Sequence, residues 1–156
     1  MNVLEREYSQ ESEDTQHGRF LTFSLGEEVF GIEIRHVTEI VGMQPITVLP
    51  EVPAYIRGII NLRGRIISVI DVRVRFGMKE AAYTDRTCII VVDIGDVAAG
   101  LIVDNVAEVI SIEDGNIVPP VESGGIHNAY LMGIGKVGDE VKLLLNCEKL
   151  FLENEL

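Results

Sequence analysis

Few residues of this 156-residue sequence have the types and spacing that catalysis or metal binding requires. The histidines His17, His36 and His127 are far apart, and none forms an i, i+4 pair or stands beside a cysteine cluster. Cys88 and Cys147 are expected to be buried apolar residues rather than nucleophiles. The sequence contains no G-x-S-x-G motif and no glycine-rich phosphate loop. It therefore predicts no metal, no cofactor and no active site.

The acidic residues offer one weak alternative to this interpretation. Asp93, Asp96 and Asp104 could supply a carboxylate pair for acid–base chemistry. Acids at strand ends more often cap turns, and that role is expected here.

Arginine is concentrated between residues 57 and 77, in a chain whose formal net charge is −12. Four of the five arginines in this segment are expected to form weak, partly solvated ion pairs with the chain's own carboxylates: Arg57, Arg65, Arg73 and Arg75. Arg63 differs because it follows an apolar run and precedes Gly64, which predicts a tight, buried strand end. A guanidinium there can bridge backbone carbonyls and a carboxylate across two strands, and Glu39 is the candidate carboxylate.

The elements that position these residues are predicted to be short β-strands joined by turns that contain glycine or proline. Turn signals every 8–12 residues are typical of a β-sandwich or of small barrels. A short helix is expected at the end of the chain. The predicted strands are 20–25, 29–34, 37–41, 59–62, 66–72, 88–94, 100–103, 106–112 and 141–145, and the helix is 147–156.

The chain contains an internal repeat. A displacement of 69 residues carries Gly31 onto Gly100 and Glu39 onto Glu108, and a displacement of 75 carries Gly58 onto Gly133. We therefore predict two similar β-rich units, 18–82 and 83–156, in a pseudo-twofold arrangement with a groove between them, after a flexible acidic tail over 1–17. Gly31 and Gly100 are expected at equivalent turns.

Composition narrows the class of partner. With 13 Lys and Arg against 25 Asp and Glu, and a pI near 4.6, the chain is expected to repel nucleic acid and anionic lipid. The N-terminal residues are acidic and lack an apolar region, so no secretory signal is expected. The apolar stretches are too short to span a membrane. These features predict a soluble cytosolic protein whose partners are other proteins.

Several segments resemble the CheW family of bacterial chemotaxis adaptors. The resemblance is carried by Asn61-Leu62-Arg63-Gly64, Leu49-Pro50, Pro53, Asp71-Val72-Arg73 and Val37-Thr38-Glu39-Ile40, and it extends from about Arg19 to Phe151. It implies an all-β fold of two SH3-like five-stranded β-barrels, together one CheW-like domain over 18–156, without catalysis. Ser68 departs from the family, which often has proline there, and puts the edge position expected for this strand in doubt.

The resemblance also implies a function. CheW adaptors couple chemoreceptors to the histidine kinase CheA, so this chain is expected in cytoplasmic receptor arrays at the inner membrane. The receptor's helical hairpin tip is expected in the groove between the barrels, and the barrel ends are expected to meet the CheA regulatory domain. The receptor-facing positions carried over are Val37, Glu39, Arg63 and Val109, whereas no kinase-binding residue is assigned.

Strand alternation predicts how these positions face. Val37 and Glu39 should share one face, and Thr38 and Ile40 the other, with Ile40 toward its own barrel core. Val109 is equivalent to Ile40 in the repeat, so a core role and a contact role both stay open for it.

Three alternatives to a chemotaxis adaptor remain. The chain could be a scaffold of another chemosensory pathway, such as surface motility or gene regulation. It could also be an enzyme, which the lack of a nucleophile–base pair disfavours, or an RNA-binding barrel, which the net charge disfavours.

Overall fold

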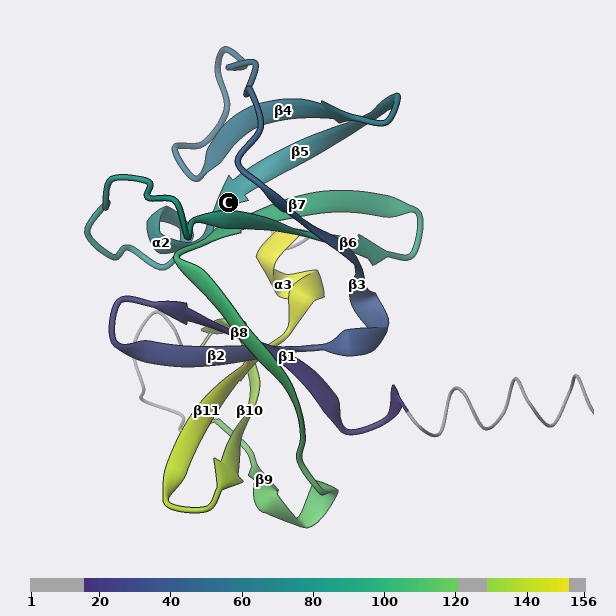
Figure 1. Ribbon diagram of the computed structural model, residues 1–156, viewed down its shortest axis with the longest axis vertical. Helices are drawn as coiled ribbons and strands as arrows, with labels where there is room; N and C mark the ends of the chain where they lie inside the picture. Colours follow the sequence, from purple (N-terminus) through teal and green to yellow (C-terminus); the bar gives the residue numbers. More distant parts are fainter. Residues whose placement is uncertain (1–15, 121–128, 152–156) are drawn as a thin grey trace, which may run out of the picture.

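The computed structural model describes residues 16–120 and 129–151, and most of this part of the chain is β-structure (Figure 1). The strands are β1 (Arg19–Leu25), β2 (Glu28–Glu33), β3 (Val37–Gly42), β4 (Ile56–Leu62), β5 (Arg65–Asp71), β6 (Cys88–Ile94), β7 (Val97–Val103), β8 (Asn105–Ser111), β9 (Ile117–Val118), β10 (Leu131–Val137) and β11 (Glu140–Leu145). The helices are α2 (Val72–Arg75) and α3 (Cys147–Phe151), with 3-10 turns η1 (Ile34–His36) and η2 (Asp114–Asn116). The predicted tail, except Gln16 and His17, lies outside the described residues.

The strands form two sheets, one above the other in Figure 1. The six-stranded sheet has the order β8-β1-β2-β11-β10-β9, and the five-stranded sheet has the order β3-β6-β7-β5-β4. The predicted all-β class, the two barrels and the short C-terminal helix are confirmed. One barrel has a sixth strand, β9, which is two residues long.

The internal repeat coincides with the strand boundaries. The displacement of 69 carries β1 onto β6, and the displacement of 75 carries β4 onto β10. The two parallel pairings are also equivalent, because Gly31 pairs with Leu144 whereas Gly100 pairs with Val69. We call residues 19–75 the first copy and residues 88–151 the second copy.

The two copies exchange strands. β1 and β2 of the first copy pair with β8 and β11 of the second, and β3 and β5 of the first copy pair with β6 and β7 of the second. A division of the chain between residues 82 and 83 therefore does not separate the two sheets. The sequence repeat identifies which segments are alike, but it carries no information on which of them pair.

The buried apolar residues that the structure describes form three clusters. The largest contains Phe23 and Phe30 of one sheet together with Ile90 and Leu101 of the other, so it joins the two barrels. A second cluster, with Ile89 and other residues of the five-stranded sheet, fills that barrel, and a third around Phe20, Ile112 and Leu144 fills the other. Because side chains alternate along a strand, one face of each sheet contributes to the cluster between the barrels and the other face to the cluster inside its own barrel.

Gly31 and Gly100 do occupy equivalent positions, but these lie inside strands β2 and β7 and not at turns as predicted. A Cβ at Gly31 would lie 3.0 Å from Leu144 Cδ2, and one at Gly100 would lie 2.7 Å from Ile89 Cγ2. The glycines are therefore required by close packing of a neighbouring side chain.

The strand that contains Ser68 is interior and not an edge. Ser68 faces Ile59 of β4 on one side and Ala99 of β7 on the other. The edge position considered for this strand is therefore wrong, and the backbone N–H that serine provides, unlike proline, suits a strand paired on both sides.

Candidate protein-binding surfaces

A β-bulge in β3 decides how the expected receptor-facing residues are presented. Val37 pairs with Val92 and Glu39 with Val91, so Thr38 is the extra residue, and its hydroxyl donates to the Val91 carbonyl at 3.1 Å. Val92 belongs to the cluster that joins the barrels, and Val91 to the interior of the five-stranded barrel. Because opposed residues share a face, Val37 and Glu39 lie on opposite faces, and the shared face predicted for them is wrong.

Ile40 corrects a second prediction. It pairs with Ile90, which places it on the same face as Val37. However, β3 is an edge strand, and Ile40 is 45% exposed instead of buried in a core. Val37 is half-buried against the cluster that joins the barrels. Ile40 is thus an accessible apolar residue at this face that the sequence analysis missed, although its repeat match to Val109 could have identified it.

The same bulge recurs in β8 of the other barrel. Val106 pairs with Phe23 and Val109 with Leu21, and the buried Thr22 hydroxyl donates to the Glu108 carbonyl at 2.8 Å and accepts from its N–H at 3.1 Å. Val109 is 39% exposed, so its side chain is available for contact and is not a core residue. Ile40 and Val109 therefore form an equivalent pair of exposed residues on two edge strands.

Arg63 and Glu39 form an ion pair, with Nη1 2.9 Å from Oε1, as the sequence suggested. The Arg63 side chain is 75% exposed, however, so the buried strand end predicted for it is wrong. Arg63 and Gly64 form a two-residue turn with φ values of 55° and 85°. Such a hairpin tip points into solvent, and among the described residues Arg63 hydrogen-bonds to Glu39 alone.

This ion pair lies where the five-stranded sheet closes into a barrel. β3 and β4 are its two edges, and Arg63 at the end of β4 reaches Glu39 on β3. Thr47, after β3, exchanges two 2.9 Å backbone hydrogen bonds with Ile59 of β4. Gly58 has a φ of 145°, and a Cβ there would overlap the Thr47 carbonyl.

The remaining arginines differ in their surroundings. Arg73 lies 2.6 Å from Asp104, and Arg65 3.3 Å from Asp93, so their predicted pairing with the chain's own acids is confirmed. Hydrogen bonding to Arg73 lowers the pKa of Asp104. Arg75 is 5% exposed, and its guanidinium carbon lies 4.0 Å and 4.9 Å from the ring centroids of two tyrosines, Tyr55 and Tyr130. The partly solvated position predicted for Arg75 is therefore wrong.

The histidines and cysteines that the structure describes do not cluster into a catalytic or metal-binding group. His17 contacts Asp114 at 3.1 Å on the surface, His36 lies 3.8 Å from Glu33, and His127 is outside the described residues. Cys147 is buried, and burial raises its pKa to about 12, whereas Cys88 is half-buried. Over residues 16–120 and 129–151, no group of three possible metal ligands occurs.

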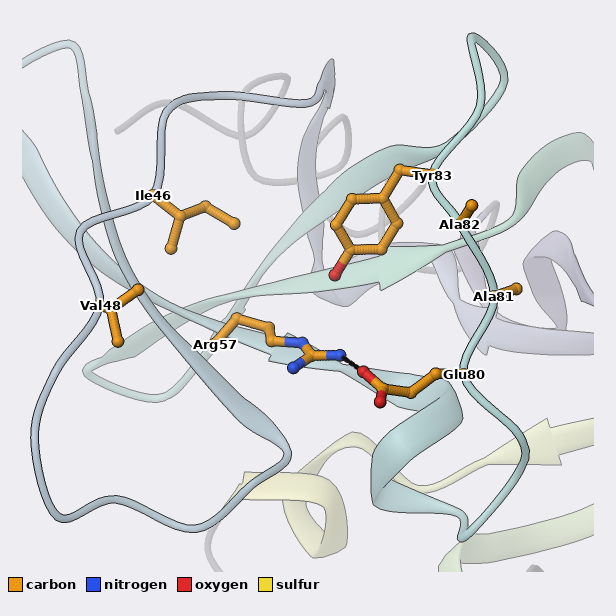
Figure 2. Close-up of a pocket in the computed structure, with 7 residues that line it drawn as sticks. All are labelled: Ile46, Val48, Arg57, Glu80, Ala81, Ala82 and Tyr83. Carbon is orange, nitrogen blue, oxygen red and sulfur yellow. Dashed lines mark hydrogen bonds and ion pairs between the residues drawn. The ribbon is translucent and has the colours of Figure 1, made fainter.

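A pocket of about 390 Å³ opens beside β4 (Figure 2). Its apolar walls come from the segment after β3 and from the segment between α2 and β6, and Arg57 lies between them. Arg57 forms ion pairs with Glu80 and, at 3.4 Å, with Asp71, and hydrogen bonding to Glu80 raises the pKa of Arg57. The residues that line the pocket are Ile46, Val48, Arg57, Glu80, Ala81, Ala82 and Tyr83.

In the described part of the chain, no helix is long and apolar enough to cross a membrane.

Comparison with known proteins identifies relatives along almost the whole chain. A family described as the CheW-like domain matches residues 19–155. The chain is 36% identical over 144 residues to "Chemotaxis protein CheW" of Klebsiella aerogenes, covering 92% of this chain and 87% of that protein. It is 37% identical over 136 residues to "Probable chemotaxis protein CheW" of Rhizobium etli, covering 86% and 88% of the two chains.

A solved structure is similar throughout. The crystal structure of the scaffolding protein TtCheW from Thermoanaerobacter tengcongensis matches with a TM-score of 0.83 and 42% identity, covering 88% of this chain and 94% of that one. A relative with a different name, "Protein FrzA" of Myxococcus xanthus, is 29% identical over 133 residues, covering 84% of this chain and 83% of that protein.

Proposed function

This chain belongs to the CheW family of chemotaxis scaffold proteins, and we propose that it is a non-catalytic adaptor that couples chemoreceptors to the histidine kinase CheA. It would do so in cytoplasmic receptor arrays at the inner membrane. The observation that carries the proposal is the pair of equivalent, exposed apolar residues, Ile40 and Val109, on the edge strands of two barrels joined by one core. A scaffold needs accessible surfaces on a rigid body.

The proposed receptor surface comprises Val37, Glu39, Arg63 and Val109, to which we add Ile40. Glu39 and its partner Arg63 lie on the other face of β3 from Val37 and Ile40, so the proposed surface extends around the edge of this strand. Ile40 and Val109 offer apolar contact area to a helical hairpin, and the Arg63–Glu39 ion pair offers charges that fix the register of the complex. Val37 is half-buried, so it packs beneath this surface and contributes little contact area of its own.

The proposed kinase surfaces are the hairpin ends of the two barrels; in the five-stranded barrel this end adjoins the proposed receptor surface, because Arg63 lies in the turn that precedes β5. Exposed aliphatic residues lie there in each barrel: Ile66 and Val97 in the five-stranded barrel, and Val141 in the six-stranded barrel. Ile66 and Val141 are equivalent in the repeat. Two similar ends on one molecule suit contact with a partner that is itself built from two such barrels, and individually weak contacts gain strength in an array.

Two substitutions test the separation of these surfaces. Ile40→Asp should weaken binding of a receptor hairpin tip by about 2–3 kcal/mol, because it places a charge in an apolar contact, while CheA binding is retained. Val141→Asp, at a residue that is likewise exposed, should weaken CheA binding and retain receptor binding. Both affinities are measured on one preparation, with thermal melts as the control for folding. If each substitution lowers both affinities equally in a folded protein, the two surfaces are not separate.

The relative named FrzA leaves a scaffold of another chemosensory pathway as an alternative function. Capture of partners from the native lysate, followed by mass spectrometry, distinguishes a chemotaxis kinase from a kinase of another chemosensory pathway.

A further inference from the structure

We propose that the pocket beside Arg57 is an additional docking site, which receives a segment of a partner protein that presents an aliphatic side chain next to a carboxylate. The aliphatic side chain would enter between Val48 and Tyr83, and the carboxylate would bind the guanidinium of Arg57 (Figure 2). None of the lining residues belongs to the proposed receptor or kinase surfaces, so this inference does not depend on them.

The cation and one wall of this pocket are held in place by a buried carboxylate. Asp71 is 4% exposed, and its Oδ2 accepts from Arg57 Nη2 at 3.4 Å and from the Tyr83 hydroxyl at 3.0 Å. Its Oδ1 accepts from the backbone N–H of Val74 at the start of α2. Arg57 and Tyr83 are therefore oriented before any ligand arrives, which lowers the entropic cost of binding.

The second copy shows that the fold does not require this charged arrangement. The displacement of 75 carries Arg57 onto Met132 and Asp71 onto Asn146, which line a cavity of the other barrel. The backbone N–H of Asn146 still donates to the Tyr130 carbonyl at 2.7 Å, as that of Asp71 donates to the Tyr55 carbonyl at 2.8 Å. Asn146 also caps α3. A neutral pair thus serves the same local structure, and the charged pair needs another explanation.

Glu80 indicates the charge of the ligand. The Glu80 carboxylate forms an ion pair with the Arg57 guanidinium (Figure 2). The Glu80 side chain is nevertheless 66% exposed, and Glu80 lies in the segment between α2 and β6. An exposed ion pair of this kind is weak and exchanges readily with solvent. The hydrogen bonds of Arg57 to Asp71 and to Glu80 both use Nη2, so the N–H groups of Nη1 can donate to a partner's carboxylate. We therefore regard Glu80 as a resident competitor that a partner's carboxylate displaces.

The test uses two substitutions that remove the same ion pair and should have opposite effects. Arg57→Met introduces the residue of the second copy and should abolish binding, whereas Glu80→Ala should strengthen binding severalfold by removing the competitor. A purely structural ion pair predicts that both substitutions act in the same direction. Arg57→Lys, which keeps the charge and loses the forked geometry, should bind with intermediate strength.

The probe is the blocked dipeptide N-acetyl-leucyl-glutamyl-methylamide, titrated into the full chain and followed by backbone amide NMR. Saturable shifts in the millimolar range are expected at Ala81, Ala82 and Tyr83, and the leucyl-lysyl dipeptide should produce none. The proposal is overturned if no saturable shift occurs at these residues, or if both dipeptides bind equally. It is also overturned if the same signals move with protein concentration alone, because the occupant is then a second copy of this chain.

Discussion

The five-stranded and six-stranded barrels have equivalent strands but different charges. Where the five-stranded barrel has the Arg63–Glu39 pair, the other barrel has Gly138 and Glu108, and where it has Arg57 and Asp71, the other has Met132 and Asn146. The bulges, the parallel pairings and the close-packed glycines recur in both. The shared features thus specify the fold, and the additional cations of the first copy are available for function.

The largest effect should come from the buried position that the copies share, Arg75 in the first and Leu150 in the second. Leu150→Ala should lower the free energy of unfolding by about 2–5 kcal/mol through cavity formation. Arg75→Ala should cost about 2–4 kcal/mol, because its side chain packs between two tyrosine rings in the core. Chemical denaturation measures both. A cost below about 1 kcal/mol for Arg75→Ala would place this arginine among ordinary surface residues.

The two bulges should respond unequally to loss of a hydroxyl. Thr22→Val should cost about 1–3 kcal/mol, because it leaves the backbone N–H of Glu108 without its partner at a buried side chain. Thr38→Val removes one hydrogen bond from an exposed residue and should cost about 0.5–1 kcal/mol. Equal losses in denaturation experiments would mean that the two bulges are held in the same way.

The loss of stability at acid pH should depend on the ion pair between Arg73 and Asp104. The pKa of Asp104 is lowered in the folded protein by its hydrogen bond to Arg73, so this carboxylate stabilises the fold above its unfolded pKa. That contribution is lost as pH falls through the lower, folded pKa. In Asp104→Asn, the free energy of unfolding should therefore be lower at neutral pH and change less between neutral pH and about pH 3. Unchanged acid dependence in this variant would contradict the assignment.

The smallest effect on stability, with a large effect on binding, should follow substitution of Arg63. Arg63→Asn removes an exposed ion pair worth about 0–1 kcal/mol and places at a φ of 55° a residue that tolerates the left-handed region. Stability should stay within about 0.5 kcal/mol of the parent chain, while receptor binding falls. Thermal melts and receptor-tip affinity separate these outcomes, and a coupled loss of both would mean that Arg63 acts through the fold.

Much of the fold followed from the sequence because apolar alternation and the repeat are both local signals. The strands 88–94 and 20–25 were predicted within a residue of β6 and β1. The exchange of strands between copies could not be predicted, because equivalence does not determine pairing. Arg63 and Arg75 were assigned the wrong burial for a related reason. The residues next to each arginine in the sequence are apolar, so the two arginines have similar surroundings in the sequence. In the structure, Arg63 lies in an exposed turn with Gly64, whereas Arg75 lies at the buried end of α2.

The site was predicted less completely than the fold. The Arg63–Glu39 pair was anticipated, but one extra residue at Thr38 reversed the faces assigned by alternation. The receptor-facing role of Val37, Glu39, Arg63 and Val109 stays a prediction. The pocket at Arg57 was not anticipated because its two walls lie on separate segments, before β4 and after α2.

The exchange of strands has a consequence for how the chain folds. β2 cannot complete its sheet until β11 is available, more than a hundred residues further along the chain, so the native contacts are mostly non-local. Topologies of this kind fold slowly, because the entropy cost of closing a long loop comes before the non-local contacts that offset it. During synthesis, the strand edges of the β1–β2 hairpin would stay unpaired until the later strands are made, and unpaired edges can pair wrongly with another chain. The first copy expressed alone would contain two strands of the six-stranded sheet, three of the five-stranded sheet and neither core in full.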